Sequence, residues 1–338
     1  MAFRCAGNHK PDTNHCVKLT KPKPLPDGGG FGSKGMAKPK PPLVVIVGPT
    51  AAGKSALAVR LARTFGGEVV SADSRQVYRG LDVGTGKISK RAMRGVPHHL
   101  LNVAGPKRPF DVVRFQRLAE RAIRDVARRG RLPFLVGGTG LWVDAVAFGI
   151  GFPAAPPNRT LRRRLATKRA RDLLAALRRL DPERAKTIEP QNPRRIIRAI
   201  EIARAIGPGR MTVRRMPYRL LWLGLAPPRG TLERRIRARV RHMIQSGLIA
   251  ETRSLRRGGV PRSRIRELGF EYRAALDCLD GKLPRSALAG AVVRASLAYA
   301  RRQLAWWRRN KNIRWLKRPT DAEPQVRRFT RQNFRKNH

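Results

Sequence analysis

A glycine-rich loop follows directly on an apolar run near residue 43, and it constrains the fold more than any other feature. The run over 43–47 is typical of a buried strand, and the loop has the G-x-x-x-x-G-K-[ST] spacing of a phosphate-binding loop. The helix-forming segment 56–62 comes next and would present its N-terminus to the same anion. We predict that a di- or triphosphate binds to Gly48, Pro49, Thr50, Ala51, Ala52, Gly53, Lys54 and Ser55.

The charge balance is strongly positive. The 338 residues include 74 Lys and Arg against 22 Asp and Glu, which gives a net charge of +52. Such an imbalance favours a polyanionic partner, and nucleic acid leads because neutralised phosphates release counterions. A codon bias toward Arg is the alternative explanation, although it would not by itself remove acidic residues.

Membrane and disulfide signals are both weak. No apolar run approaches the ~20 residues that span a bilayer, and the N-terminus lacks the apolar stretch of a secretory signal. The three cysteines, Cys5, Cys16 and Cys278, form an odd and sparse set. Such a set is typical of a reducing compartment. We therefore expect a cytoplasmic protein without membrane association, and a monomer.

The chain divides into a core, an insertion and two tails. Strand and helix patterns alternate over 41–150 and 217–318, and 151–216 has Arg-dense helical patterns without a strand pattern. We predict an α/β fold, in which a P-loop NTPase-like parallel sheet core carries a helical insertion domain. Residues 1–40 are predicted to be a disordered basic tail and 319–338 a basic C-terminal tail.

Local patterns place the elements of this core. We expect a helix that begins near Thr231 and carries an apolar stripe as far as Leu248. Further helices are expected at 111–129 and 286–307. Strands are expected at 43–47, 68–72, 134–136, 219–225 and 313–316.

Asp73 comes directly after the second strand pattern, where open α/β sheets place their ligands. A carboxylate at such an edge could hold Mg²⁺, together with Ser55, or accept a proton from a substrate. A capped turn is the alternative, because Asp often caps the turn at a strand end. The residues alone leave both interpretations open.

The third strand pattern ends in Gly137-Gly138-Thr139-Gly140, where many P-loop ATPases have a Walker-B Asp. The chain also lacks the Asn-Lys-x-Asp pattern that reads guanine. Both features argue against a motor ATPase and a GTPase. The glycines are consistent with close approach of a flat substrate or with a tight turn.

Several further motifs closely resemble those of the bacterial tRNA dimethylallyltransferase family. They lie over 71–87, 97–100, 136–141, 192–201 and 299–306, and with the loop they extend the resemblance from about 43 to 318. The family transfers a dimethylallyl group from dimethylallyl diphosphate to N6 of the adenosine 3′-adjacent to the anticodon, in tRNAs that read codons beginning with U. Its loop holds the pyrophosphate of the prenyl donor, and the acceptor base is flipped out of its stack.

The resemblance also implies roles for matching positions. Asp73 would be the general base on N6, and Thr139 would hydrogen-bond near the same amine. Lys54, Ser55 with Mg²⁺, and Arg239 would stabilise the departing pyrophosphate. Contacts with tRNA would come from Asp73, Ser74, Arg75, Gln76, Arg194, Arg195, Ile196, Ile197 and Arg198.

Two other classes of function are consistent with parts of the sequence. A small-molecule P-loop enzyme, such as an adenylate isopentenyltransferase acting on free AMP or a kinase, does not need so basic a surface. A non-catalytic RNA-binding protein does not need an intact Lys54, Ser55 and Asp73. We therefore favour an enzyme that acts on tRNA.

Overall fold

The fold is described from a computed structural model, over residues 40–208, 212–213 and 217–334. The disordered tail predicted for 1–40 lies outside these residues, apart from Lys40. The chain separates into a core unit, Met36–Ile150 with Arg214–His338, and a unit that includes Gly151–Val213, called the insertion below. Each unit is described by itself. Within the described ranges, no helix has the length and apolar character needed to cross a bilayer.

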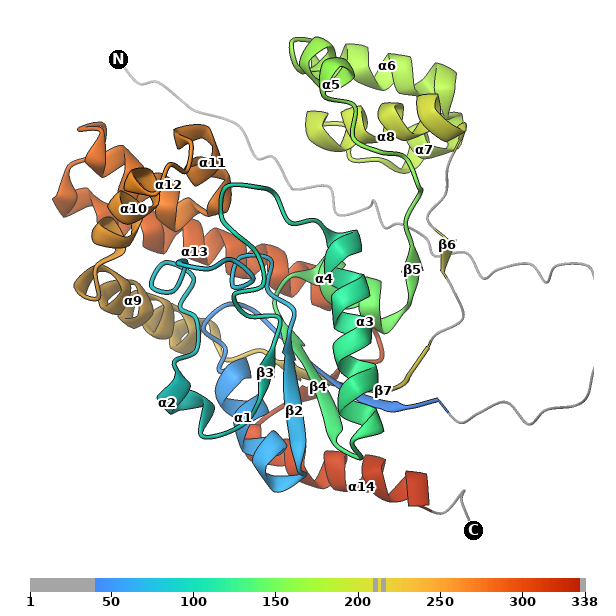
Figure 1. Cartoon of the computed structure of the whole chain (residues 1–338), viewed down its shortest axis with the longest axis vertical. Helices are drawn as coiled ribbons and strands as arrows, with labels where there is room; N and C mark the ends of the chain where they lie inside the picture. Colours follow the sequence, from blue (N-terminus) through green and yellow to red (C-terminus); the bar gives the residue numbers. More distant parts are fainter. Residues whose placement is uncertain (1–39, 209–211, 214–216, 335–338) are drawn as a thin grey trace, which may run out of the picture. The chain divides into compact units, whose positions relative to one another are not determined.

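A six-stranded sheet lies at the centre of the core unit, in the order β3-β2-β4-β1-β7-β8 (Figure 1). All of its pairings are parallel, and Val47 of the central β1 lies opposite Gly137 and Gly224. The predicted parallel sheet is therefore confirmed. Its strands are β1 (Pro42–Val47), β2 (Gly67–Ser71), β3 (His98–His99), β4 (Leu132–Gly137), β7 (Arg219–Leu225) and β8 (Arg314–Leu316).

Alternating side chains of the sheet build two apolar layers. Val44 and Ile46 of β1 pack in one buried cluster with residues of α1 (Lys54–Thr64) and α14 (Ala322–Phe334). Val45 of β1 packs in the other, with residues of α3 (Val112–Arg128) and α4 (Gly140–Ala147). The two-residue period of a strand produces this division. Because helices cover both faces, the loops at the carboxyl ends of the strands are left to build a site.

The remaining helices of the core unit include α2 (Lys90–Met93) and a series that follows β7. The series is α9 (Arg229–Gln245), α10 (Leu248–Arg257), α11 (Arg262–Leu268), α12 (Phe270–Leu279) and α13 (Arg285–Trp307). The prediction for 286–307 is confirmed by α13.

The helix predicted from Thr231 to Leu248 is wrong at both ends. It begins after Pro228, whose fixed φ suits a position just before a helix. Gly247 has φ 94°, a left-handed conformation that favours glycine, and it separates α9 from α10. Leu248 therefore begins the next helix.

The basic C-terminal tail predicted for 319–338 is also corrected. A 3₁₀ turn at Pro319–Asp321 leads into α14, whose Val326 and Phe329 are buried against the sheet. The Arg219 guanidinium lies 4.0 Å from the centre of the Phe329 ring and donates a hydrogen bond to its backbone carbonyl at 2.7 Å. This segment is part of the core unit through residue 334.

The insertion has an apolar core of its own, to which Leu173, Leu177 and Ile196 contribute. Its helices are α5 (Arg159–Ala166), α6 (Ala170–Leu180), α7 (Pro182–Thr187) and α8 (Pro193–Ile206). Two short strands, β5 (Ile150–Gly151) and β6 (Thr212–Val213), pair near its ends. No strand was predicted there, because two-residue strands leave no periodic pattern.

Candidate active site

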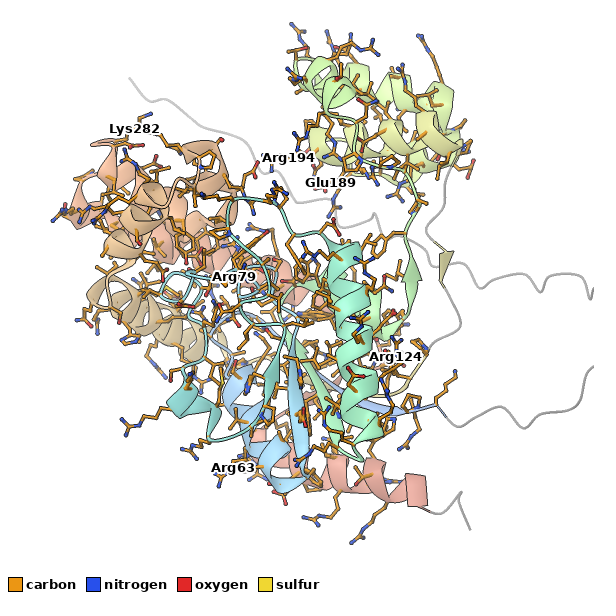
Figure 2. All side chains as sticks on the ribbon, in the orientation of Figure 1. Arg63, Arg79, Arg124, Glu189, Arg194 and Lys282 are labelled. Carbon is orange, nitrogen blue, oxygen red and sulfur yellow. The ribbon has the colours of Figure 1, made fainter. Side chains whose placement is uncertain are left out.

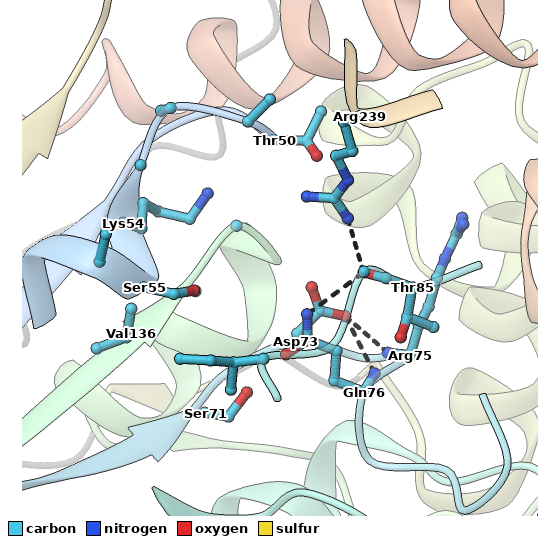
Figure 3. Close-up of a pocket in the computed structure, with 18 of the residues that line it drawn as sticks. Thr50, Lys54, Ser55, Ser71, Asp73, Arg75, Gln76, Thr85, Val136 and Arg239 are labelled. Carbon is cyan, nitrogen blue, oxygen red and sulfur yellow. Dashed lines mark hydrogen bonds between the residues drawn. The ribbon is translucent and has the colours of Figure 1, made fainter. Parts of the chain in front are cut away.

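A cavity of about 400 Å³ lies where β1, β2 and β4 end. The phosphate-binding loop, the turn after β2, and helices α9, α12 and α13 all contribute to its lining. Figure 3 shows Lys54 and Ser55 pointing from one side toward the space that Asp73 and Arg239 face from the other. Four predicted site residues from three separate segments therefore meet at one cavity.

The loop residues from Thr50 to Ser55 line this cavity, whereas Gly48 and Pro49 are not among its lining residues. Gly48 has φ 144°, and a Cβ there would lie 2.3 Å from the backbone oxygen of Leu225, so only glycine fits. Gly53 has φ 95° and precedes the first turn of α1. The loop and the N-terminal end of α1 thus face the cavity, an arrangement that would suit an anion.

Lys54 is the half-buried lysine that lines this part of the cavity. Its Nζ donates a hydrogen bond to the Pro49 carbonyl at 2.7 Å. Burial lowers the pKa of Lys54 to about 8, Asp73 acts against that change, and the nearby charge of Arg239 adds to it. The mutual influence of these charges agrees with their placement around one cavity, and an incoming anion would favour the charged lysine.

Asp73 caps the turn after β2 and also lines the cavity. Its Oδ1 accepts backbone hydrogen bonds from Arg75 at 2.9 Å and Gln76 at 3.3 Å, so the carboxylate does cap the turn. In the part of the chain that the structure describes, Oδ2 has no hydrogen-bond partner. One oxygen is fixed and the other is available to a ligand in the cavity.

Thr139 connects the end of β4 to this turn. Although it precedes α4, its side chain does not cap that helix. Its hydroxyl instead accepts a hydrogen bond from the Ser74 backbone N–H at 3.2 Å. Thr139 is thus adjacent to the Asp73 turn without being among the residues that line the cavity.

The neighbouring glycines serve the packing of this chain. A Cβ on Gly137 would lie 2.2 Å from the Ala72 carbonyl oxygen, and one on Gly138 would lie 2.2 Å from Nε2 of Gln303. The turn after β4 is therefore glycine-rich because other parts of the core approach it closely. The close approach of a substrate is not needed to explain these residues.

Two arginines of α9 face the cavity. Arg239 donates from Nη2 to the Thr85 carbonyl at 2.7 Å, and Arg235 donates to the Ala52 carbonyl at 3.3 Å. They are four residues apart, so they lie on the same side of the helix. The loop and α9 together surround the cavity with cationic groups.

The lining residues that sequence reasoning missed include three polar ones from α12 and α13. Glu271 pairs with Arg75 at 2.7 Å, and burial raises its pKa despite that partner. Gln303 of α13 accepts from the Thr50 backbone N–H at 2.8 Å and donates to the Gly138 carbonyl at 2.9 Å, so it ties the loop to the end of β4. The third is Tyr299, and the resembling motif over 299–306 was the only signal for it or for Gln303.

The residues predicted to contact tRNA fall into two groups. Asp73, Arg75 and Gln76 line the cavity of the core unit, with Ser74 between them. The second group belongs to α8 of the insertion, where Arg194 and Arg195 are exposed. Figure 2 shows Arg194 extending from the insertion.

The prediction for the rest of the second group is corrected. Ile196 is fully buried and Ile197 is 8% exposed, both within the insertion's own core, so their side chains stabilise α8. Arg198 pairs with the buried Glu201 and donates to the Ala155 carbonyl at 2.8 Å. These contacts hold the Arg198 side chain against other residues of the insertion.

Comparison with known proteins agrees with this geometry. A family model described as IPP transferase matches residues 76–310, and one described as isopentenyl transferase matches 41–103. The chain is 44% identical over 282 residues to a tRNA dimethylallyltransferase of Thermomicrobium roseum, covering 81% of this chain and 85% of the relative. A tRNA dimethylallyltransferase of Anaeromyxobacter sp. is 46% identical over 303 residues, covering 85% and 98%.

Solved structures show the same relationship. The tRNA isopentenylpyrophosphate transferase of Bacillus halodurans is 36% identical, with a TM-score of 0.67, and the match covers 88% of this chain and all of that one (100%). A eukaryotic dimethylallyltransferase acting on tRNA is 26% identical, with a TM-score of 0.68 and coverage of 79% and 70%. The chain therefore belongs to the IPP transferase family, the family of the tRNA dimethylallyltransferases.

Proposed function

We propose that this chain transfers the dimethylallyl group of dimethylallyl diphosphate to N6 of the adenosine 3′-adjacent to the anticodon, in tRNAs that read codons beginning with U. One observation carries the proposal: among the described residues the Asp73 carboxylate has one oxygen without a hydrogen-bond partner, and it lies across a single cavity from Lys54 and the phosphate-binding loop. A base and a phosphate-binding loop that line the same cavity suit a transfer that removes a proton and releases a diphosphate.

In the proposed reaction, the N6 nitrogen attacks C1 of the dimethylallyl group and the C1–O bond to the diphosphate breaks. Asp73 takes one proton from N6 as the new C–N bond forms, so the product amine is neutral and diphosphate leaves. The adenine amine is a weak nucleophile because its lone pair is delocalised into the ring. A positioned base typically contributes ~10²–10⁴-fold to such a step.

The departing diphosphate would be stabilised by the loop N–H groups, Lys54 and Arg239. An allylic carbon supports positive charge, so neutralising the leaving group lowers the barrier. Ser55, and through water Asp73, offer oxygen donors of the kind that Mg²⁺ prefers, and the ion would supply further charge to the diphosphate. Thr139 would hydrogen-bond near the amine through the turn that it shares with Ser74.

The tRNA would be held by the Asp73–Gln76 turn at the cavity and by exposed arginines of the insertion, Arg194 and Arg195. The net charge of +52 supports a polyanionic acceptor. The proposal includes a cytoplasmic monomer, as predicted from the sequence. A prenyl transferase acting on free AMP is the second candidate, because the same cavity could hold an adenine.

Competition between acceptors tests the proposal. The protein is incubated with dimethylallyl diphosphate, Mg²⁺ and equal concentrations of AMP and an anticodon stem-loop with consecutive adenosines, and both products are weighed by mass spectrometry. We expect one added C5 unit on the RNA and none on AMP. A C5 unit on AMP with none on RNA would establish the second candidate instead. A stem-loop with guanosine at the target position is the control and should stay unmodified.

A further inference from the structure

Glu251 of α10 lies outside the cavity lining, yet its carboxylate organises a loop that borders the cavity. Its Oε2 accepts the backbone N–H groups of Asp82 and Val83, each at 2.8 Å. Its Oε1 accepts the Gly84 N–H at 2.9 Å and the Tyr272 hydroxyl at 2.7 Å. The two oxygens of one carboxylate thus hold three successive N–H groups and a phenol.

Packing fixes the same loop independently of these hydrogen bonds. A Cβ on Gly84 would lie 2.6 Å from Cζ of Tyr272, so the loop runs directly against the ring and only glycine fits. Burial and the neighbouring Glu251 raise the pKa of Tyr272 above its usual range, so the phenol stays a hydrogen-bond donor. Helices α10 and α12 therefore hold the loop from two directions.

The loop carries the partner of the arginine that faces the anion site. Thr85, which follows Gly84, is buried, and its carbonyl accepts from Nη2 of Arg239 at 2.7 Å. A Cβ on Gly86 would lie 2.7 Å from the same Nη2, so loop and guanidinium are in close contact. In the described part of the chain Arg239 makes no ion pair, which leaves the Thr85 carbonyl as the acceptor that orients it.

We propose that Glu251 is a positioning residue for diphosphate binding: it fixes the 82–86 loop so that the Thr85 carbonyl aims Arg239 into the cavity. The inference rests on the proposed function, in which Arg239 binds the diphosphate. Preorganised charges stabilise an anion without reorganisation when it forms. A loosened loop would let Arg239 turn away from the anion, although Glu251 itself never touches it.

A double-mutant cycle tests the inference. Binding of inorganic diphosphate with Mg²⁺ is measured by calorimetry for the full chain, Glu251→Gln, Arg239→Gln and the double variant. The glutamine side chain places an N–H donor where a carboxylate oxygen of Glu251 accepts backbone N–H groups of the loop. At least one of these hydrogen bonds is therefore lost in Glu251→Gln. We expect Glu251→Gln to weaken binding about tenfold and the double variant to bind no more weakly than Arg239→Gln. Independent losses that multiply, or wild-type affinity in a folded Glu251→Gln variant, would overturn the inference.

Two further variants keep the test decisive. Glu233→Gln on α9 removes a partly exposed carboxylate that pairs with Arg237, and it should leave the affinity unchanged. Tyr272→Phe removes one of the four hydrogen bonds that Glu251 accepts and keeps the ring. It can therefore replace Glu251→Gln in the double-mutant cycle if that variant does not fold. Its loss, about threefold, should vanish when Arg239 is also replaced, and a loss that persists there contradicts the inference.

The readout separates this inference from the proposed function, because diphosphate binding needs no acceptor. A protein that binds diphosphate with the expected cycle but adds no C5 unit to RNA would contradict the function and leave the role of Glu251 standing. If the protein adds a C5 unit to RNA but the affinity losses of Glu251→Gln and Arg239→Gln multiply, the function would stand and the role of Glu251 would be contradicted.

Discussion

At the scale of single residues, the half-buried Lys54 of the phosphate-binding loop is predicted to make donor binding depend on pH. Burial places the pKa of Lys54 at about 8, so the unliganded side chain loses its charge as pH rises through that value. We predict that affinity for dimethylallyl diphosphate falls between pH 8 and 10, approaching tenfold per pH unit, because binding must then also take up a proton. Calorimetric titrations across this range measure it.

Lys54→Arg is the matched variant for this prediction. Arginine stays charged throughout the range, so its affinity should lose the pH dependence, even if the absolute affinity is lower. Because both proteins meet the same ligand, ionisation of the diphosphate cancels in the comparison. Equal pH profiles for the two proteins would show that Lys54 is not the titrating group.

Asp144 provides a second test at this scale, on stability. Burial raises its pKa from 3.8 to about 7, only partly offset by the Trp306 N–H, which donates to it at 2.9 Å. The folded state therefore holds a proton that the unfolded chain loses, and stability falls as pH rises from about 4 to 7. Asp144→Asn keeps the Trp306 bond and should stabilise the protein at pH 8 by about 2 kcal/mol, with little effect near pH 4.

Urea unfolding at both pH values measures this difference. Asp125, the partly exposed partner of Arg128, provides the control. Asp125→Asn should change the free energy of unfolding by less than about 0.5 kcal/mol. A gain from Asp144→Asn that is equal at both pH values would refute the titration argument.

At the scale of elements, a buried carboxylate joins α5 to α8 in the insertion. Glu201 is 2% exposed and accepts from Arg162 at 2.8 Å. Burial acts to raise its pKa, but hydrogen bonds from Arg162 and Arg198 outweigh that effect and lower it. Glu201→Ala would leave both arginines without this partner, and we expect the insertion to lose about 2–3 kcal/mol of stability, seen as faster hydrogen exchange in α5 and α8.

A surface pair in the same unit is the control for Glu201. Glu189 and Arg195 lie 3.3 Å apart with side chains more than half exposed, at 56% and 60%. Glu189→Ala should change the stability of the insertion by less than about 1 kcal/mol, because exposed pairs are screened by solvent. Equal effects of the two substitutions would mean that burial does not matter here.

Elements with a strong pattern were predictable, and those without one were not. The apolar runs at β1, β4 and β7 are continuous because these strands are buried on both faces. By contrast, α14 has few apolar residues among its arginines, so Val326 and Phe329 give no clear signal until the sheet is there to cover them. A start at Thr231 was expected on cap preference, but Pro228 begins α9 earlier.

The site was predictable where one local motif contains the residue. Lys54 and Ser55 begin the helix after the β1 loop, and Asp73 lies in the turn after β2, so the fold class alone brings them to one edge. Glu251, Glu271 and Gln303 reach the same region from helices far along the chain. No local pattern encodes which helix approaches which strand end, so these roles emerge only from the tertiary structure.

At the scale of the whole molecule, the net charge of +52 makes RNA binding an electrostatic event. If the protein neutralises about 6–10 phosphates of the RNA, we predict that its affinity for the RNA falls about 10³–10⁵-fold between 50 and 200 mM salt. Fluorescence anisotropy with a labelled anticodon stem-loop measures the slope. An affinity independent of salt would exclude a phosphate-based interface.

Single arginine variants show which surface contributes to this slope, the dependence of RNA affinity on salt. Arg194→Ala on α8 should reduce it by about one unit if that side chain contacts a phosphate. Arg63→Ala at the far end of α1 is the matched loss of one exposed charge and should leave the slope nearly unchanged (Figure 2). Equal effects would mean that only total charge matters.

We propose that the cavity around Asp73 is where a prenyl group is transferred to RNA, and one measurement tests this most directly. Wild-type protein and Asp73→Asn are incubated with dimethylallyl diphosphate, Mg²⁺ and the adenosine-bearing stem-loop, and the mass of the RNA is followed over time while its affinity is measured separately. We predict a single C5 addition by the wild type, a rate at least ~10²-fold lower for Asp73→Asn, and unchanged RNA affinity. Near-normal transfer by Asp73→Asn, or no C5 addition by the wild type, would contradict the account.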